Sequence, residues 1–174
     1  MQTAAINPDA RGVEFKDEIM GRLIRFVSAH EVGHTLGLPH NMGSSVAYKV
    51  DQLRDPEFTK KYGTAPSIMD YARFNYIAQP GDGDVALMPN IGPYDKYSIK
   101  WGYKPILDKT AEEEKSTLDE WILEKAGDPM YRFGRQQIGG VIDPSSQTED
   151  LGDDSMKASE YGIENLKRIV PNLI

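Results

Sequence analysis

His30-Glu31-Val32-Gly33-His34-Thr35-Leu36-Gly37-Leu38-Pro39-His40 is the stretch that decides the fold, and it contains every histidine of the chain. On an α-helix His30 and His34 lie about one turn apart, so their imidazoles leave the same face roughly 6 Å from each other. Gly37 can adopt a positive φ that ends the helix, and Pro39 prevents its continuation. The chain then turns, and His40 can reach the same point from outside the helix.

The three histidines predict a site for a divalent metal ion. Neutral imidazoles bind zinc at about 2.0–2.1 Å, and three protein ligands leave one position open, as in catalytic zinc sites. Glu31 projects to the side of His30 and His34, so it is better placed to take a proton from water than to be a third ligand. The alternative is an ordinary surface or core helix that matches the short H-E-x-x-H pattern. The added glycine and His40 favour zinc.

Residues 30–40 resemble the extended zinc signature of the metzincin metallopeptidases. Ser67-Ile68-Met69-Asp70-Tyr71 resembles the Met-turn of that clan, in which a methionine lies beneath the zinc ligands. The resemblance implies that Met69 is this methionine, and that Tyr71 ligates the resting metal or stabilises an oxyanion. From the residues alone, Met69 could be an ordinary core methionine and Tyr71 a buried tyrosine with a bonded hydroxyl.

Looser matches near the C-terminus resemble large bacterial zinc peptidases of the metzincin type. They are Asp143-Pro144, residues 149–154 and Asn165-Leu166-Lys167. The resemblance implies a zinc-dependent endopeptidase that acts on peptides or proteins, with Gly37 and Met69 as structural support. It also implies export from the cell, as a periplasmic, outer-membrane-associated or secreted protein.

The composition indicates a loop-rich globular protein. The chain of 174 residues is long enough for one domain with a hydrophobic core, and it has 16 glycines and 11 prolines. The net charge of −7 argues against a nucleic-acid partner. No apolar run approaches the roughly 18 residues of a membrane span, and the first residues lack the features of a signal peptide. Without cysteine, disulfides and a thiolate zinc ligand are excluded.

Residues 14–36 are predicted to form the helix that carries the first two histidines. Its apolar residues fall on two sides: Ile19, Leu23, Phe26 and Val27 on one, and Ala29, Val32 and Leu36 on the other. This pattern predicts a central helix that is packed on both sides.

Metzincin domains place a twisted sheet and another helix before the zinc helix, whereas only 29 residues precede His30. The resemblance therefore predicts a mainly α chain with long irregular loops. It would comprise the zinc helix and C-terminal subdomain of a zincin-like α+β catalytic domain, with the N-terminal sheet largely absent. The missing N-terminal catalytic subdomain is expected to pack on the zinc helix, where the face of Ile19, Leu23 and Val27 otherwise lies exposed. A compact domain that closes its cleft differently is the alternative.

The rest of the chain is predicted to form helices separated by loops. The expected helices cover residues 45–50, 56–62, 93–102, 108–126 and 155–169. Two units are expected: residues 1–107, with the zinc helix, Met-turn and third helix, and residues 108–174, a helical extension packed on them. Alternating Asp and Gly in residues 79–84 indicate a turn, with a calcium site as the alternative.

Three functions remain open at this point. In a zinc endopeptidase, Glu31 accepts a proton from the water that attacks a peptide carbonyl and passes it to the leaving amine, while Tyr71 helps to stabilise the oxyanion. A metal-bound scaffold or interaction module without catalysis is the second, because a chain that lacks half of its cleft can be inactive. A zinc hydrolase that cleaves another kind of bond is the third.

Overall fold

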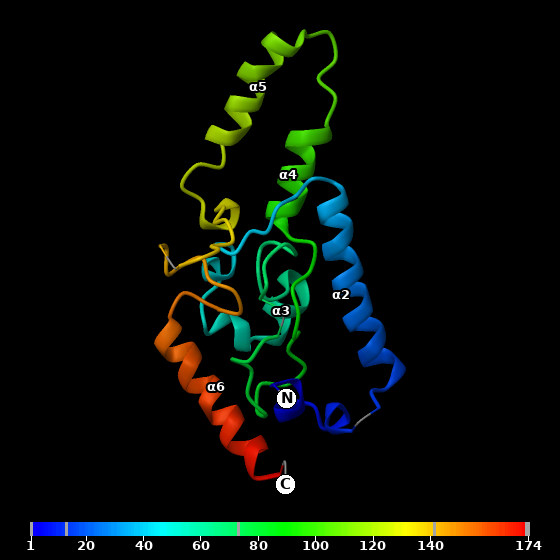
Figure 1. Ribbon diagram of the computed structural model, residues 1–174, viewed down its shortest axis with the longest axis vertical. Helices are drawn as coiled ribbons and strands as arrows, with labels where there is room; N and C mark the ends of the chain where they lie inside the picture. Colours follow the sequence, from blue (N-terminus) through cyan, green and yellow to red (C-terminus); the bar gives the residue numbers. More distant parts are fainter. Residues whose placement is uncertain (1, 13, 73, 141, 173–174) are drawn as a thin grey trace.

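The computed structural model describes residues 2–12, 14–72, 74–140 and 142–172 as helices joined by long loops (Figure 1). The α-helices are α1 (Gln2–Ile6), α2 (Asp17–Thr35), α3 (Pro56–Tyr62), α4 (Pro93–Tyr103), α5 (Ala111–Leu123) and α6 (Ser155–Ile169). The 3-10 helices are η1 (Pro8–Arg11), η2 (Ser45–Ala47), η3 (Gln52–Arg54), η4 (Pro129–Tyr131) and η5 (Val170–Asn172). Within these residues there is no β-strand, and one isolated antiparallel bridge joins Asn41 to Arg135. The predicted mainly α fold is therefore confirmed for the described chain.

Local capping residues determine where most helices begin and end. The Asp55 side chain accepts hydrogen bonds from the backbone N–H groups of Glu57 and Phe58, and Gly63 ends α3 with a φ of 70°. The side chain of Asp154 caps α6 in the same way. The helices predicted over residues 56–62, 93–102 and 155–169 are confirmed to within one residue.

Three of the predicted helices have wrong bounds. The helix predicted over 108–126 is shorter, because the N–H of Thr110 donates to Glu113 Oε2 (2.8 Å) in a capping box that starts α5 at Ala111. The expected helix at 45–50 is only the single 3-10 turn η2. Helix α2 begins at Asp17, three residues later than predicted.

The main hydrophobic core joins the first half of the chain to its C-terminal part. The buried residues of this cluster are Tyr48, Val50, Leu53, Ala65, Ala72, Ile77, Leu151 and Ala158. Leu151 and Ala158 lie beyond residue 107, so both predicted units contribute to one cluster. The division of the chain at this position stays a prediction.

Helix α2 lies at the side of the molecule (Figure 1). It buries only Phe26, His30 and Gly33, and Phe26 packs in a second cluster with Ile68 and Met69. Val27 and Val32, one from each predicted apolar side, are 52% and 54% exposed. The predicted central helix, packed on both sides, is therefore wrong: helical periodicity identified the apolar residues but not which of them find a partner.

Helices α4 and α5 run side by side and extend away from the core (Figure 1). The ammonium groups of Lys100 on α4 and of Lys104, which directly follows α4, lie 4.3 and 5.5 Å from the ring centre of Trp121 on α5. No residue of α5 is fully buried. None of the helices in the described residues is both long and apolar enough to cross a membrane.

Candidate metal centre

The end of α2 turns the chain back toward the helix. The N–H of Leu38 donates to the carbonyl of Gly33 (3.0 Å), and the N–H of Gly37 donates to that of His34 (2.9 Å). These two bonds and the φ of 83° at Gly37 form a Schellman motif. As predicted for Gly37, the turn reverses the chain and returns His40 to the side of the helix that carries the other two histidines.

The three imidazoles converge on one point. Ring centres are 4.8 Å apart for His30 and His34, 4.7 Å for His34 and His40, and 5.3 Å for His30 and His40. Each ring offers a nitrogen within 4.8 Å of the other two, and the Nε2 atoms of His34 and His40 are 3.1 Å apart. Tetrahedral zinc with bonds of about 2.0–2.1 Å places its ligand atoms about 3.3 Å from one another. The geometry therefore fits one ion.

The Nδ1 atom of each histidine is held by an oxygen acceptor. The acceptors are Ile68 O for His30 (2.7 Å), Leu38 O for His34 (2.9 Å) and Gln136 Oε1 for His40 (2.7 Å). Because an oxygen acceptor requires a proton on Nδ1, each neutral ring keeps the lone pair of Nε2 for a metal. The Nε2 atom of His30 is buried without a hydrogen-bond partner among the described residues, as expected of a metal ligand.

The environment of His30 also favours its neutral form. Burial lowers the pKa of His30, and the nearby His34 and His40 lower it further, although the bond to the Ile68 carbonyl opposes both effects. A histidine must be neutral to bind a metal, so this ring is prepared for coordination at neutral pH.

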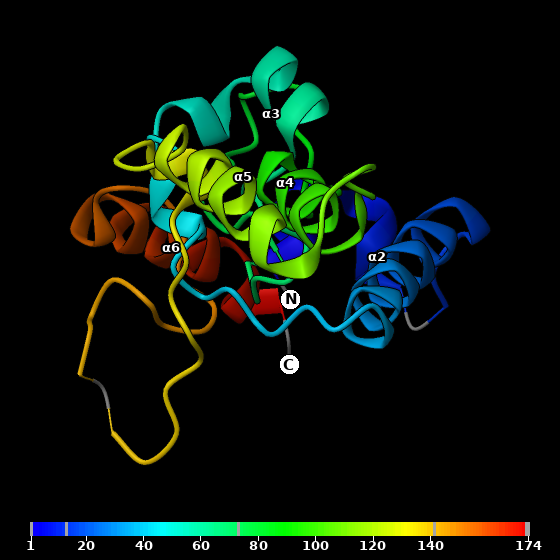
Figure 2. The same cartoon turned by 90° about the horizontal axis from the view of Figure 1, so that it is seen from above.

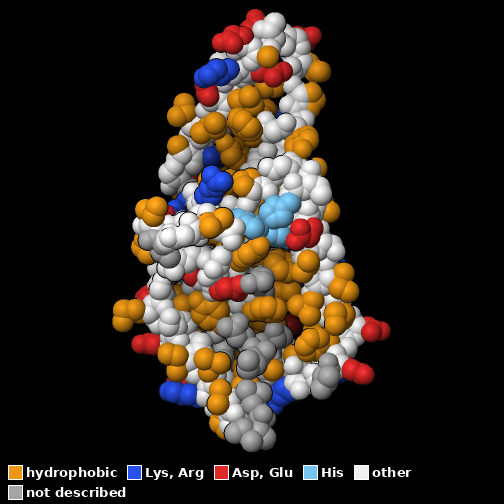
Figure 3. Space-filling view, viewed as in Figure 1, with side chains coloured by type: hydrophobic (Ala, Val, Ile, Leu, Met, Phe, Trp, Pro, Cys, Tyr) orange, Lys and Arg blue, Asp and Glu red, His pale blue; other side chains and the backbone are white. Residues whose placement is uncertain are grey.

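The histidine cluster is open to solvent. Figure 3 shows the histidine side chains at the surface in the middle of one face, next to an acidic side chain. His34 and His40 are half-buried, and Glu31 is exposed. The ring centre of Tyr71 lies 4.5 Å from that of His40 and 5.4 Å from that of His30. The structure thus brings Tyr71 to the cluster, and it leaves Glu31 accessible to water.

Met69 is fully buried beneath α2. A Cβ atom on Gly33 would overlap the Met69 sulfur, so any side chain at this position would force the buried methionine to move. Sequence reasoning selected Met69 but missed Gly33. The sequence did contain a signal for Gly33. Glycine in the interior of a helix lowers helix stability by about 1 kcal/mol relative to alanine, so its presence there suggests a packing requirement.

Asp95, which sequence reasoning also missed, binds the segment of Ser67 and Ile68 that lies behind the histidine cluster. Its carboxylate accepts hydrogen bonds from Ser67 Oγ (2.6 Å), Ile68 N (2.8 Å) and Gly92 N (2.7 Å). Asp95 therefore caps the start of α4 and holds Ile68, whose carbonyl in turn holds His30. Burial raises the pKa of Asp95, and these three donors oppose that rise.

A second buried carboxylate, Asp70, follows Met69. It accepts hydrogen bonds from Ser44 Oγ (2.9 Å) and the Ser45 N–H (2.8 Å), and Ser45 Oγ donates to Asp150 (2.9 Å). Burial raises the pKa of Asp70 to about 7, and the nearby Asp150 adds to this rise. These bonds connect the segment behind the histidines to the loop that precedes α6.

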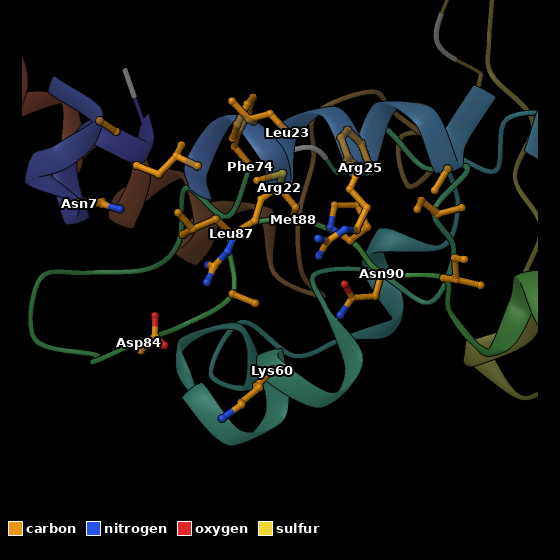
Figure 4. A pocket seen from close by; sticks show the side chains of 18 of the residues that line it. Asn7, Arg22, Leu23, Arg25, Lys60, Phe74, Asp84, Leu87, Met88 and Asn90 are labelled. Atoms are coloured by element: carbon orange, nitrogen blue, oxygen red, sulfur yellow. The ribbon is translucent and has the colours of Figure 1, made fainter. Parts of the chain in front are cut away.

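A cavity of about 570 Å³ lies beside the cluster, between α2 and residues 86–91. Its lining is mainly apolar, and Arg22 and Arg25 extend into it from α2 (Figure 4). Phe26, one turn before His30, belongs to its lining, whereas neither the three histidines nor Glu31 does. The candidate metal centre is thus an open surface site rather than the floor of this cavity.

The alternative calcium site at residues 79–84 finds no support. Both carboxylate oxygens of Asp82 bond to the guanidinium of Arg54, with Nε at 2.8 Å from Oδ2. Wherever the structure describes the chain, the histidine cluster is the only group of three or more His, Cys, Asp or Glu side chains that could hold a metal ion.

Comparison with known proteins agrees with this geometry. No curated protein and no solved structure matched the chain. A family model described as Met-zincin matches residues 12–174, which include the histidine cluster, the segment beneath it and α6. Because the match covers nearly the whole chain, this protein belongs to the Met-zincin family.

Proposed function

We propose that this chain carries the catalytic centre of a zinc-dependent endopeptidase. His30, His34 and His40 would hold the zinc ion, and Glu31 would act as the general base. The observation that carries the proposal is that three imidazoles meet at one point with their Nδ1 atoms already bonded to oxygen acceptors. Membership of the Met-zincin family suggests the same activity.

Each residue of the cluster would have a distinct role in peptide hydrolysis. When bound, zinc supplies Lewis acidity, which polarises a carbonyl group and lowers the pKa of water. Glu31 is exposed and follows His30 directly, so its carboxylate would take the proton of the attacking water and return it to the leaving amine. Tyr71, whose ring lies against those of His30 and His40, would donate a hydrogen bond to the developing oxyanion.

The open position of the cluster supports a polymeric substrate. A chain that passes across a surface site can be cleaved without entering a closed cavity, whereas a small molecule is normally bound in a concave pocket. The accessible Glu31 and the half-buried His34 and His40 are therefore suited to an extended peptide. Met69 and Gly37 would contribute structural support, the first by packing under α2 and the second by ending it.

Replacing Glu31 with Gln tests this proposal. The amide keeps the size of the side chain but cannot accept the proton, so we expect turnover to fall by about 10²–10⁴-fold while zinc stays bound. The measurements are hydrolysis of a fluorogenic casein and elemental analysis of the purified protein. Glu18→Gln, another exposed glutamate on α2, is the matched control, and His34→Ala should lose the metal.

The possible results separate the competing functions. Full peptidase activity in Glu31→Gln would refute the role of the general base. A wild-type chain that binds zinc but cleaves neither casein nor peptides would support a scaffold without catalysis. Absence of zinc binding in the wild-type chain would overturn the metal centre itself.

A further inference from the structure

We infer that Gln136 is a positioning residue for His40, the third of the proposed zinc ligands. The inference rests on the proposed metal centre, and it adds a residue that lies 96 positions away in the sequence. Gln136 Oε1 accepts a hydrogen bond from His40 Nδ1 at 2.7 Å, on the side of the ring opposite to Nε2.

His40 needs an outside support more than the other two histidines. His30 and His34 stand on α2, and backbone carbonyl groups hold their Nδ1 atoms. His40 lies beyond the end of this helix, in a segment without regular structure. Its Nδ1 atom is held by a side chain, so the orientation of its ring depends on where Gln136 is placed.

The backbone next to Gln136 is docked firmly on the segment that follows His40. Asn41 is fully buried, and its side chain donates to Arg132 O (2.9 Å) and accepts from Gly134 N (2.9 Å). Gly43 N donates to Gly134 O (3.3 Å), and Asn41 and Arg135 form the isolated bridge. Residues 132–135 therefore run alongside residues 41–43, and this pairing places Gln136 beside His40.

Two glycines make this close docking sterically feasible. A Cβ atom on Gly43 would come within 2.8 Å of Gly134 N, and one on Gly134 would come within 2.8 Å of Gly43 Cα. Real Cβ atoms essentially never approach other atoms so closely, so any side chain at either position would push the two segments apart. The spacing that brings Gln136 to His40 thus requires glycine on both sides.

The loop that carries Gln136 is held together by hydrogen bonds between its own residues. It projects from the body of the molecule between η4 and α6 (Figure 2). Arg132 pairs with Asp143 (2.9 Å), and Gln137 Nε2 donates to the carbonyls of Asp143 (2.7 Å) and Ser146 (3.1 Å). Gln136, at the base of this loop, turns instead to His40.

The amide oxygen of Gln136 determines both the tautomer and the plane of the His40 ring. By accepting from Nδ1, it keeps the proton on that atom and leaves the Nε2 lone pair directed at His34, whose Nε2 lies 3.1 Å away. Without this acceptor, His40 could rotate or move its proton to Nε2, and one of the three ligands would be lost for part of the time.

Replacing Gln136 with Met tests the inference, because methionine keeps the length of the side chain but lacks the strong acceptor. The loss of a hydrogen-bond partner behind a metal-bound histidine typically weakens metal affinity by about 10–100-fold, and we expect a loss of this size. Zinc affinity is measured on the full chain by competition with a chromogenic chelator. Gln136→Glu, which retains an acceptor oxygen, should restore affinity to within a few-fold of wild type. Gln147→Met, a glutamine of the same loop whose side chain bonds to Pro144 O, is the matched control.

A second readout does not depend on zinc. The proton on His40 Nδ1 should give a slowly exchanging imidazole NMR signal in the metal-free wild type and in Gln136→Glu, and this signal should be absent in Gln136→Met. Equal zinc affinity and an unchanged signal in Gln136→Met would overturn the inference while the metal centre stands. A wild-type chain that binds no zinc would overturn the proposed function, and the inference with it.

Discussion

Replacing Asp95 with Ala should destabilise the protein and weaken its metal centre together. Asp95 is 3% exposed, and its carboxylate accepts hydrogen bonds from Ser67 Oγ, Ile68 N and Gly92 N. Alanine leaves the two backbone N–H groups without a partner, at about 1–3 kcal/mol for each buried donor. Removal of the buried charge offsets part of this cost. We therefore expect the free energy of unfolding to fall by about 2–4 kcal/mol, a large fraction of the roughly 5–15 kcal/mol that stabilises a typical domain.

The matched variant Asp95→Asn separates the hydrogen bonds from the charge. Its amide oxygen can accept from both backbone N–H groups, and the hydroxyl of Ser67 can rotate to accept from the amide NH₂. We therefore expect Asp95→Asn to lower the free energy of unfolding by less than about 1.5 kcal/mol. Asp119→Ala, which removes an exposed partner of Lys115, should change the free energy of unfolding by less than about 1 kcal/mol.

The assay is urea unfolding of the metal-free proteins. Their unfolding midpoints are compared on condition that the free energy of unfolding has the same slope against urea concentration in each variant. Zinc affinity should also fall in Asp95→Ala, because the Ile68 carbonyl that holds His30 loses its own support. Equal unfolding midpoints for Asp95→Ala and Asp95→Asn would refute the reasoning, since the hydrogen bonds would then contribute nothing beyond the shape of the side chain.

Three further predictions concern the same region. Gly33→Ala should destabilise the protein by about 1–3 kcal/mol in thermal unfolding, because its Cβ would overlap the buried Met69 sulfur. In a Met69→Ala background this clash is gone and alanine should stabilise the helix by up to about 1 kcal/mol, so a destabilisation that persists there would point to another cause. Since the pKa of Asp70 is raised to about 7, the folded chain holds a proton that the unfolded chain releases, so stability should fall by up to about 1.4 kcal/mol per pH unit from pH 4 to 7. Asp70→Asn should flatten this part of the profile in urea titrations, and an unchanged slope would contradict the assignment. Removal of zinc with a chelator should lower the melting temperature, and added zinc should restore it in a concentration-dependent way in the wild type but not in His34→Ala.

Local chemistry made much of the chain predictable. Asp55 before Pro56 and Gly63 after Tyr62 define α3 through contacts within a few residues, and Gly37 ends α2 by the same kind of short-range rule. The spacing of the three histidines likewise brings their backbone positions together, because the helix and the turn after it determine where these side chains begin. Such features depend on residues that are close in the sequence, so they can be predicted without knowledge of the tertiary structure.

Long-range contacts were beyond the reach of that reasoning. Helical periodicity showed that α2 has two apolar sides, yet only the packing against Ile68 and Met69 decided which side is buried. Asp95 looked like an ordinary acidic residue in the first turn of a helix until the fold brought Ser67 and Ile68 to its carboxylate.

By itself, then, the sequence determined the mainly helical fold, most helix ends and the three candidate metal ligands, because each follows from contacts that span a few residues. Only the tertiary structure decided what holds those ligands in place: Asp95 behind His30, Gly33 above Met69, and Gln136 against His40. The physical reason is that a hydrogen bond between residues 96 positions apart leaves no periodic trace in either segment, and it exists only once the whole chain has packed.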